Sequence, residues 1–318
     1  MVDYLYLALY KLFALILWLF PRKILLKIMK GISWFADSVS SKHRKIIQTN
    51  LNMAFGNGGF SPEQDEAKAI VSKSNLSLKE QKAYGVSAFM NLLDTTLGII
   101  ARDGMHKDEV IKNVSFEGEE IVQKYQNAGK KIIFVTGHQG NWELLSQAIA
   151  IKFDLTLVGV GRKLDSELMD RVLKENRERF NVEMVYKKGA MKGCIKALSQ
   201  NKAVGILVDQ AIRPNQSIEV NFFDHPATHT PLASILSRKF DIDLIPAFIS
   251  TDDYMHYHVK IYEPIKSIKT DNQDEDLAKL TQAQADAMQV AIEAHPKEWF
   301  WMHKRWKNTT ENVYKAQK

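Results

Sequence analysis

His138 and Glu143 stand five residues apart, separated by glutamine, glycine, asparagine and tryptophan. The apolar, mostly β-branched residues 132–136 precede them and predict a buried strand, which Gly137 ends with a tight turn. Asn141 is an expected N-cap, so a helix is predicted to begin directly after it. The pattern therefore predicts an imidazole on a strand-to-helix loop, with a carboxylate about one helical turn further on.

This pair of residues could perform general-base catalysis. Ligands of open α/β sheets bind at the carboxyl ends of the strands, where this loop would lie. If Glu143 accepts the Nδ1 proton of His138, it fixes the tautomer and leaves Nε2 free as a base. Alternatively, Glu143 only complements the dipole of its helix and His138 is an ordinary loop residue.

The composition is that of a folded protein without disulfides. The chain has 318 residues, of which 45% are hydrophobic and 25% charged, enough to bury a sizeable core. The single cysteine, Cys194, excludes an intrachain disulfide and falls in an apolar helical pattern, which predicts a buried thiol. His256 and His258 would share one face of a strand, but a third metal ligand is missing from the pattern. We therefore expect neither a metal nor a cofactor.

The N-terminus has the pattern of a membrane anchor. Residues 4–20 are apolar apart from Lys11, and as a helix they would be about 26 Å long, the short limit for a bilayer. Residues 22–35 interleave lysines with isoleucine, leucine and phenylalanine, as in a basic amphipathic helix at an anionic membrane surface. We predict an anchor over residues 1–38 and a catalytic domain over residues 39–318. Whether the anchor spans the bilayer or lies in its interface is open.

The excess of positive charge also informs the choice of partners. The formal net charge is +6, but the basic residues are dispersed and no nucleic-acid-binding pattern is present. Anionic lipid, or an acidic partner that carries the substrate, explains this charge better than nucleic acid. Because the basic residues follow the apolar run, the positive-inside rule places the rest of the chain in the cytoplasm.

Strand-like and helical segments alternate from residue 131 onward. This order predicts an α/β fold with a mainly parallel mixed sheet and helices on both faces. A long helix over residues 79–102 has one charge, Asp94, between residues 83 and 101, and its polar content favours burial over spanning. A further helix start is expected at Ser61 and Pro62. The expected strands are residues 132–136, 155–160, 182–186, 204–208, 244–248 and 258–261; the expected helices are residues 141–151, 166–180, 191–199, 231–239 and 275–294.

Four segments in this order resemble the late acyltransferases of bacterial lipid A biosynthesis. These lauroyl and myristoyl transferases belong to the wider lysophospholipid-acyltransferase-like superfamily. His225 and the run His229-Thr230-Pro231 depart from the family's pattern, which bears on substrate details rather than on the reaction. The four segments are Gly137-His138 through Glu143; Gly161-Arg162 with Asp165, Arg171, Asn176 and Arg177; Val208-Asp209-Gln210 with Phe222-Phe223 and Pro226-Ala227-Thr228; and residues 296–301 with 303–307.

The resemblance implies transfer of a fatty acyl chain from an acyl thioester to a hydroxyl of a lipid A precursor. His138 would be the base and Glu143 would stabilise its imidazolium. Acyl carrier protein is favoured as the donor, and the enzyme would act at the bacterial inner membrane from the cytoplasmic side. The alternatives are transfer from acyl-CoA to another glycolipid or a lysophospholipid, and hydrolysis by a membrane-surface esterase.

The resemblance also implies supporting residues. Arg162 would lie near the oxyanion or an acceptor phosphate, although it could simply be solvated at a helix start. Asn141, Asp209 and Gln210 would support the site, and Asp209 could equally be a helix cap. Three tryptophans near the C-terminus fit either a membrane interface or local core packing; they are Trp299, Trp301 and Trp306.

Overall fold

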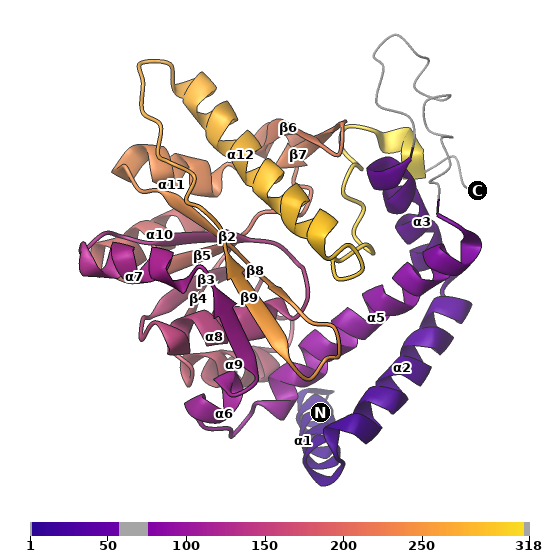
Figure 1. The fold of residues 1–318 in the computed structure, drawn as a ribbon. Helices are drawn as coiled ribbons and strands as arrows, with labels where there is room; N and C mark the ends of the chain where they lie inside the picture. Colours follow the sequence, from indigo (N-terminus) through magenta and orange to yellow (C-terminus); the bar gives the residue numbers. More distant parts are fainter. Residues whose placement is uncertain (1, 57–75, 315–318) are drawn as a thin grey trace.

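A seven-stranded sheet forms the centre of the computed structural model, which describes residues 2–56 and 76–314 (Figure 1). The expected helix start at Ser61 and Pro62 lies outside the described residues. The strand order is β1-β9-β8-β2-β5-β3-β4, and every neighbouring pair is parallel except β8 with β9. This sheet confirms the predicted fold class. The strands are β1 (Val114–Glu117), β2 (Ile133–Thr136), β3 (Leu157–Gly161), β4 (Val182–Tyr186), β5 (Ala203–Leu207), β8 (Leu244–Ser250) and β9 (Tyr257–Ile261).

Helices cover both faces of this sheet, and a separate antiparallel hairpin joins β6 (Ile218–Phe222) to β7 (His225–His229). The helices are α1 (Val2–Leu19), α2 (Arg22–Val39), α3 (Ser41–Phe55), α5 (Leu78–Ala101), α6 (Lys107–Ile111), α7 (Glu119–Asn127), α8 (Trp142–Lys152), α9 (Glu167–Glu178), α10 (Ala190–Ser199), α11 (Leu232–Phe240) and α12 (Gln273–Ala294).

Successive side chains of β2 point to opposite faces of the sheet, which explains why a core with its own helices lies on each face. Phe134 packs in one core with residues of α7 and α8, whereas Ile133 and Val135 pack in another with residues of α10 and α11. All seven residues of β8 are buried, as expected for a strand that is covered on both faces. Cys194 of α10 lies in the second core, and burial raises the pKa of its thiol to about 11. The predicted burial of this thiol is therefore confirmed, and its raised pKa makes it a poor nucleophile.

A third core lies between α3, α5, α12 and the hairpin, and Phe248 of β8 contributes to it. Trp299, Trp301 and Trp306 are its largest side chains, and each is at most 1% exposed. The sequence left two roles open for these three tryptophans, a membrane interface and local core packing. Their burial shows that they pack in the core.

The N-terminal helices α1 and α2 pack against the rest of the fold rather than lying apart from it. α2 packs along α5 (Figure 1), with Leu25, Met29, Ser33 and Asp37 on its buried face. α1 packs against α5 and α9. Within the described residues, α5 is the one helix that is long and apolar enough to cross a membrane, and 44% of its apolar window is buried.

Candidate active site

Two neighbouring parallel strands bring His138 and Asp209 together. β2 pairs with β5 in a register that places Thr136 opposite Leu207. His138 and Asp209 each lie two residues beyond that pair, at the carboxyl edge of the sheet. Nδ1 of His138 is 2.8 Å from Oδ1 of Asp209. The sheet topology therefore forms this histidine–carboxylate pair at the edge where α/β enzymes bind ligands.

Asp209 is buried and receives two further hydrogen bonds. Its Oδ2 accepts from the backbone N–H of His138 at 3.0 Å and from the indole N–H of Trp299 at 2.9 Å. Burial opposes ionisation of Asp209, but the charge on His138 and the hydrogen bonds from His138 and Trp299 outweigh it. Together they hold the pKa of Asp209 well below its usual value. Asp209 is thus ionised at neutral pH and is placed to accept the Nδ1 proton of His138, the arrangement that selects the tautomer with Nε2 free.

The structure corrects the expectation that Glu143 would be the carboxylate at Nδ1 of His138, because Asp209 takes that position. Glu143 lies in the first turn of α8 and accepts two hydrogen bonds from Arg177 of α9. These join Nη2 to Oε1 at 2.6 Å and Nε to Oε2 at 3.0 Å. Arg177 uses its planar guanidinium for a bidentate pair. A catalytic role for Glu143 stays a prediction. In any such role Glu143 would act while paired with Arg177 of α9.

The loop that carries His138 is held by the C-terminal segment. The carbonyl of His138 accepts from the N–H of Phe300 at 2.9 Å, and the N–H of Gly140 donates to the carbonyl of Glu298 at 3.0 Å. The imidazole packs against the rings of Trp142 and Phe300, at centroid distances of 5.0 and 6.2 Å. Because its backbone and its ring are both held, His138 has little freedom to leave the geometry set by Asp209.

The two glycines of this loop serve different purposes. Gly140 adopts the left-handed conformation (φ +54°), and a Cβ there would lie 2.4 Å from the carbonyl oxygen of Ile249. Gly137 does not adopt that conformation, but a Cβ would lie 2.4 Å from the sulfur of Met288. At Gly137 the clash is with the end of a flexible side chain, whereas at Gly140 it is with backbone, so the position that requires glycine is Gly140.

Two cavities meet at His138. The first, of about 230 Å³, runs between the sheet and α8 and is mostly apolar beyond the Glu143–Arg177 pair. The second, of about 810 Å³, opens over the loops after β3, β4 and β5. His138 and Arg162 line both cavities. Apolar residues of the first cavity include Phe134, Leu145, Ile149, Leu157, Val182 and Met184.

The other predicted site residues lie around this junction. Asn141 is confirmed as the N-cap of α8, since its Oδ1 accepts from the N–H of Leu144 at 3.0 Å. The side-chain nitrogen of Gln210 lies 3.3 Å from Nε2 of His138. Arg162 is exposed and lies 3.3 Å from Asp165, at the rim of both cavities.

His256 and His258 each have a carboxylate of their own. Nδ1 of His256 lies 2.8 Å from Asp253, and Nε2 of His258 lies 3.1 Å from Glu117. In the part of the chain that the structure describes, no three metal-binding side chains gather. Each of these histidines therefore lies beside a carboxylate at the protein surface.

Sequence reasoning missed Trp299 as a member of the site, although it noted the segment that contains it. Its indole hydrogen bond to Asp209 joins residues 90 positions apart. The available signal was the unusual density of tryptophan in residues 299–306, which composition alone could not connect to a catalytic carboxylate.

The fold and the site define an α/β protein with a histidine–carboxylate pair beside an apolar cavity. The chain belongs to the bacterial lipid A biosynthesis acyltransferase family, whose model matches residues 1–308. The lipid A biosynthesis lauroyltransferase of Escherichia coli (strain K12) is 24% identical over 304 residues, 94% of this chain and 91% of that protein. The phosphatidylinositol mannoside acyltransferase of Mycobacterium tuberculosis (strain ATCC 25618 / H37Rv) is 24% identical over 185 residues, 56% of this chain and 55% of that protein. The protein is therefore an O-acyltransferase, which confirms the predicted family and enzyme class.

Proposed function

We propose that this enzyme transfers a fatty acyl chain from acyl carrier protein to a hydroxyl of a lipid A precursor. One observation carries the proposal: His138, oriented by ionised Asp209, lies where an apolar cavity and a larger, basic-rimmed cavity meet. Such a junction lets a base reach an acyl carbonyl and a hydroxyl together, as a direct transfer requires.

The reaction needs the unprotonated Nε2 of His138. The acceptor hydroxyl gives its proton to Nε2 while its oxygen attacks the thioester carbonyl, and Asp209 stabilises the resulting imidazolium. The tetrahedral intermediate then collapses, the C–S bond breaks, and His138 returns the proton to the leaving thiolate. The acceptor hydroxyl would displace the amide of Gln210, which lies 3.3 Å from Nε2.

The first cavity fits the acyl chain. Its wall is formed by side chains of β2, β3, β4 and α8 and by Gly159, Gly161 and Gly205, which leave the space above the strands open. The terminal methyl of Met184 lies 2.5 Å from where a Cβ of Gly161 would be. Because Met184 is a flexible side chain in this wall, it would help to set the length of chain that the cavity holds.

The second cavity fits the polar partners. Arg162 and Lys187 lie on its wall, and apolar residues of α10 and α11 form its floor. Arg162 lies beside the exposed Asp165 rather than beside a buried carboxylate. Its charge therefore suits the oxyanion that develops during transfer, or a phosphate of the acceptor. The two cavities thus separate the acyl chain from the charged part of the substrates, with His138 between them.

The proposal is tested by the products of the purified enzyme. With acyl carrier protein thioester and lipid A precursor in mixed micelles, mass spectrometry should find acylated acceptor in equal amount to the free carrier thiol. His138→Ala should lower the transfer rate about 10²–10⁴-fold, the usual cost of losing a positioned base. Free fatty acid as the main product would instead identify an esterase, and unchanged transfer by His138→Ala would overturn the proposed base.

We infer that the enzyme is attached to the cytoplasmic face of the inner membrane by α1 and α2. Both helices expose large apolar side chains, and the exposed lysines of α2 lie among them. Apolar side chains mixed with lysine suit an anionic lipid surface. The exposed residues include Leu5, Leu12, Phe13, Leu15 and Trp18 of α1, and Ile24, Ile28, Ile32, Trp34 and Phe35 of α2.

The docking of α1 favours an interfacial position over a membrane span. Tyr10, at the middle of α1, is 7% exposed and donates to Asp103 at 2.9 Å, and Arg179 donates to the same carboxylate at 3.1 Å. If α1 spanned the bilayer in this arrangement, Asp103 and Arg179 would lie at its centre, where charges are costly. In the interface, the same contacts face the aqueous side.

Cysteine labelling distinguishes the two positions, because Cys194 is the single cysteine and is buried. In a Cys194→Ser background, Asp3→Cys in α1 and Lys42→Cys in α3 are exposed to an impermeant maleimide in inverted and right-side-out vesicles. An interfacial α1 predicts that both positions are labelled in inverted vesicles only. Labelling of position 3 from the opposite side would show that α1 spans.

A further inference from the structure

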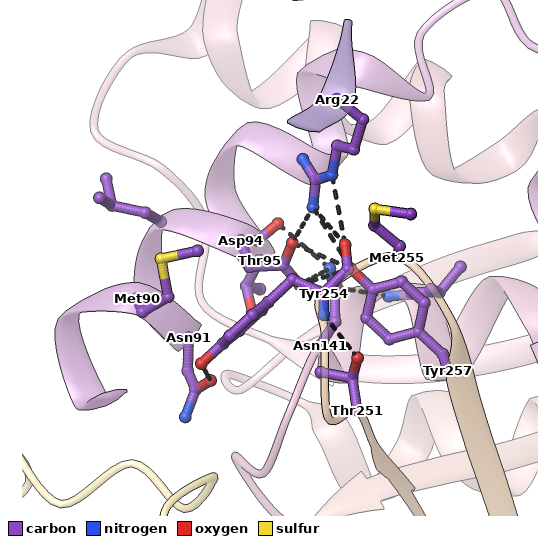
Figure 2. A network of polar contacts seen from close by, with 12 residues as sticks. Arg22, Met90, Asn91, Asp94, Thr95, Asn141, Thr251, Tyr254, Met255 and Tyr257 are labelled. Carbon is purple, nitrogen blue, oxygen red and sulfur yellow. Dashed lines mark hydrogen bonds and ion pairs between the residues drawn. The ribbon is translucent and has the colours of Figure 1, made fainter. Parts of the chain in front are cut away.

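A buried carboxylate on α5 links the membrane-facing helix α2 to the loop that carries His138 (Figure 2). The side chain of Asp94 is 2% exposed. Its carboxylate pairs with Arg22 at the start of α2, accepts from the hydroxyl of Tyr257 at 2.9 Å, and accepts from the amide of Asn141 at 2.8 Å. Three separate segments of the fold therefore share one negative charge.

Asn141 connects the carboxylate of Asp94 to the loop that carries His138. Its Nδ2 donates to the carboxylate and to the backbone carbonyl of Asp94, while its Oδ1 caps α8. The neighbouring Thr95 donates to the carbonyl of Gly140 at 3.3 Å. Two consecutive residues of α5 thus hold two consecutive residues of the loop, two and three positions after His138. A change at Asp94 would be transmitted to the place where His138 is held.

The cation of this network comes from the segment that we assign to the membrane. Arg22 is the first residue of α2 and follows Pro21, which lies between α1 and α2. Its side chain remains 31% exposed. It also donates to the carbonyl of Tyr254 at 3.1 Å. Among the described residues, Arg22 is the one cation within ion-pair distance of the Asp94 carboxylate, and the buried guanidinium of Arg102, which lines the same cavity, also interacts with this charge. If α2 leaves its position on α5, Asp94 therefore loses its direct ion pair, and Arg102 is the cation that remains near it.

We propose that Arg22 is a positioning residue that makes the geometry of His138 depend on the seating of the N-terminal helices. This inference rests on the proposed acyl transfer. A buried carboxylate that loses its direct ion pair must find water or a proton, and either change disturbs its bonds to Asn141 and Tyr257. The enzyme is then fully competent only when α1 and α2 are in place, which couples catalysis to the membrane surface that holds the acceptor.

A set of charge variants of the purified, full-length enzyme tests this coupling, with Asp94→Asn alone completing the cycle of single and double variants. Arg22→Gln should lower kcat at least about tenfold with KM for both substrates nearly unchanged, because the base and not the binding cavities is disturbed. Arg22→Lys, which keeps the charge without the planar fork, should give an intermediate kcat. Arg22→Gln combined with Asp94→Asn removes both charges and should recover kcat to within about threefold of the wild type.

The control is a matched ion pair away from the site. Arg238 of α11 donates to Asp276 of α12 at 2.8 Å, and Asp276 is also 2% exposed at its side chain. Arg238→Gln removes the cation from an equally buried carboxylate, so it should lower the unfolding temperature without lowering kcat. Sedimentation with vesicles should be the same for all variants, which separates positioning from membrane attachment.

Hydrogen exchange gives a readout that does not need turnover. Amides of residues 138–145 should exchange faster in Arg22→Gln than in the wild type, and the double variant should restore their protection. Wild-type kcat in Arg22→Gln, or no recovery in the double variant, would overturn the inference. If His138→Ala also retains activity, the proposed function itself has failed; if His138→Ala is inactive, only the coupling has failed.

Discussion

The indole N–H of Trp299 donates to Oδ2 of Asp209, the carboxylate whose Oδ1 holds the imidazole of His138. Trp299→Phe removes this donor and keeps most of the packing. A hydrogen bond to a charged group contributes about 1.5–3 kcal/mol, so kcat should fall about 10–100-fold while KM changes little. Steady-state kinetics of acyl transfer check this.

Trp301→Phe is the matched control for that variant. Trp301 is equally buried and also uses its indole N–H, but it donates to the carbonyl of Pro296 at 2.6 Å. Both variants should lose thermal stability to a similar extent, and Trp301→Phe should keep its kcat. Equal kcat losses in the two variants would mean that the tryptophans act through the core alone.

Acyl-chain preference should change at Met184. Met184→Ala enlarges the first cavity, so the ratio of kcat/KM for longer over shorter acyl donors should rise. Each additional methylene that becomes buried is expected to contribute about 0.8 kcal/mol, roughly a fourfold change. Met191→Ala, which lines only the second cavity, serves as the control. An unchanged chain-length profile in Met184→Ala would place the acyl chain elsewhere.

Donor selection should depend on the basic rim of the second cavity. Lys187 and Lys188 follow β4 and are exposed, and Lys187 lines the cavity. Lys187→Glu with Lys188→Glu should raise KM for the acidic acyl carrier protein at least about tenfold at low salt, and less as salt screens the charges. Lys112→Glu, at the end of α6, should have little effect. Better use of acyl-CoA by the wild type, with little salt dependence, would contradict this donor.

The raised pKa of Glu298 predicts how the free energy of unfolding depends on pH. Burial raises the pKa of Glu298 to about 8 from an ordinary value of 4.5. Between these values the folded protein binds more protons than the unfolded chain, so stability falls as pH rises, by at most about 1.4 kcal/mol per pH unit. Glu298→Gln lacks this dependence, and its stability relative to the wild type should increase from pH 5 to pH 8. Urea unfolding at both pH values checks this, and parallel changes in the two proteins would contradict it.

Much of the fold could be predicted because its periodic segments are long and apolar. All strands expected from residue 132 onward are present, and so are the helices between them. β1 was missed because half of its four residues are exposed and it shows no apolar run. The β6–β7 hairpin was missed because β7 contains His225, Pro226 and His229, a composition untypical of a strand. The two histidines are buried, and His225 packs against Trp306 of the tryptophan core.

The sequence predicted where the candidate site residues lie, but not which of them contact one another. His138 and Asp209 were both placed at strand ends, yet their contact depends on the register of β2 with β5, which a single sequence does not contain. Glu143 has the spacing of a partner, but Arg177 of α9 pairs with it. The helix that would supply Arg177 was predicted; its packing against α8 was not.

The most direct test of the His138–Asp209 account is kcat for acyl transfer by purified Asp209→Asn, measured beside Glu143→Gln with circular dichroism as a check of folding. We predict that Asp209→Asn lowers kcat about 10²–10⁴-fold, because the imidazole loses the partner that fixes its tautomer and stabilises its charge. Glu143→Gln, which weakens only the ion pair with Arg177, should lose less. Near-normal kcat in folded Asp209→Asn, with an inactive Glu143→Gln, would contradict the account.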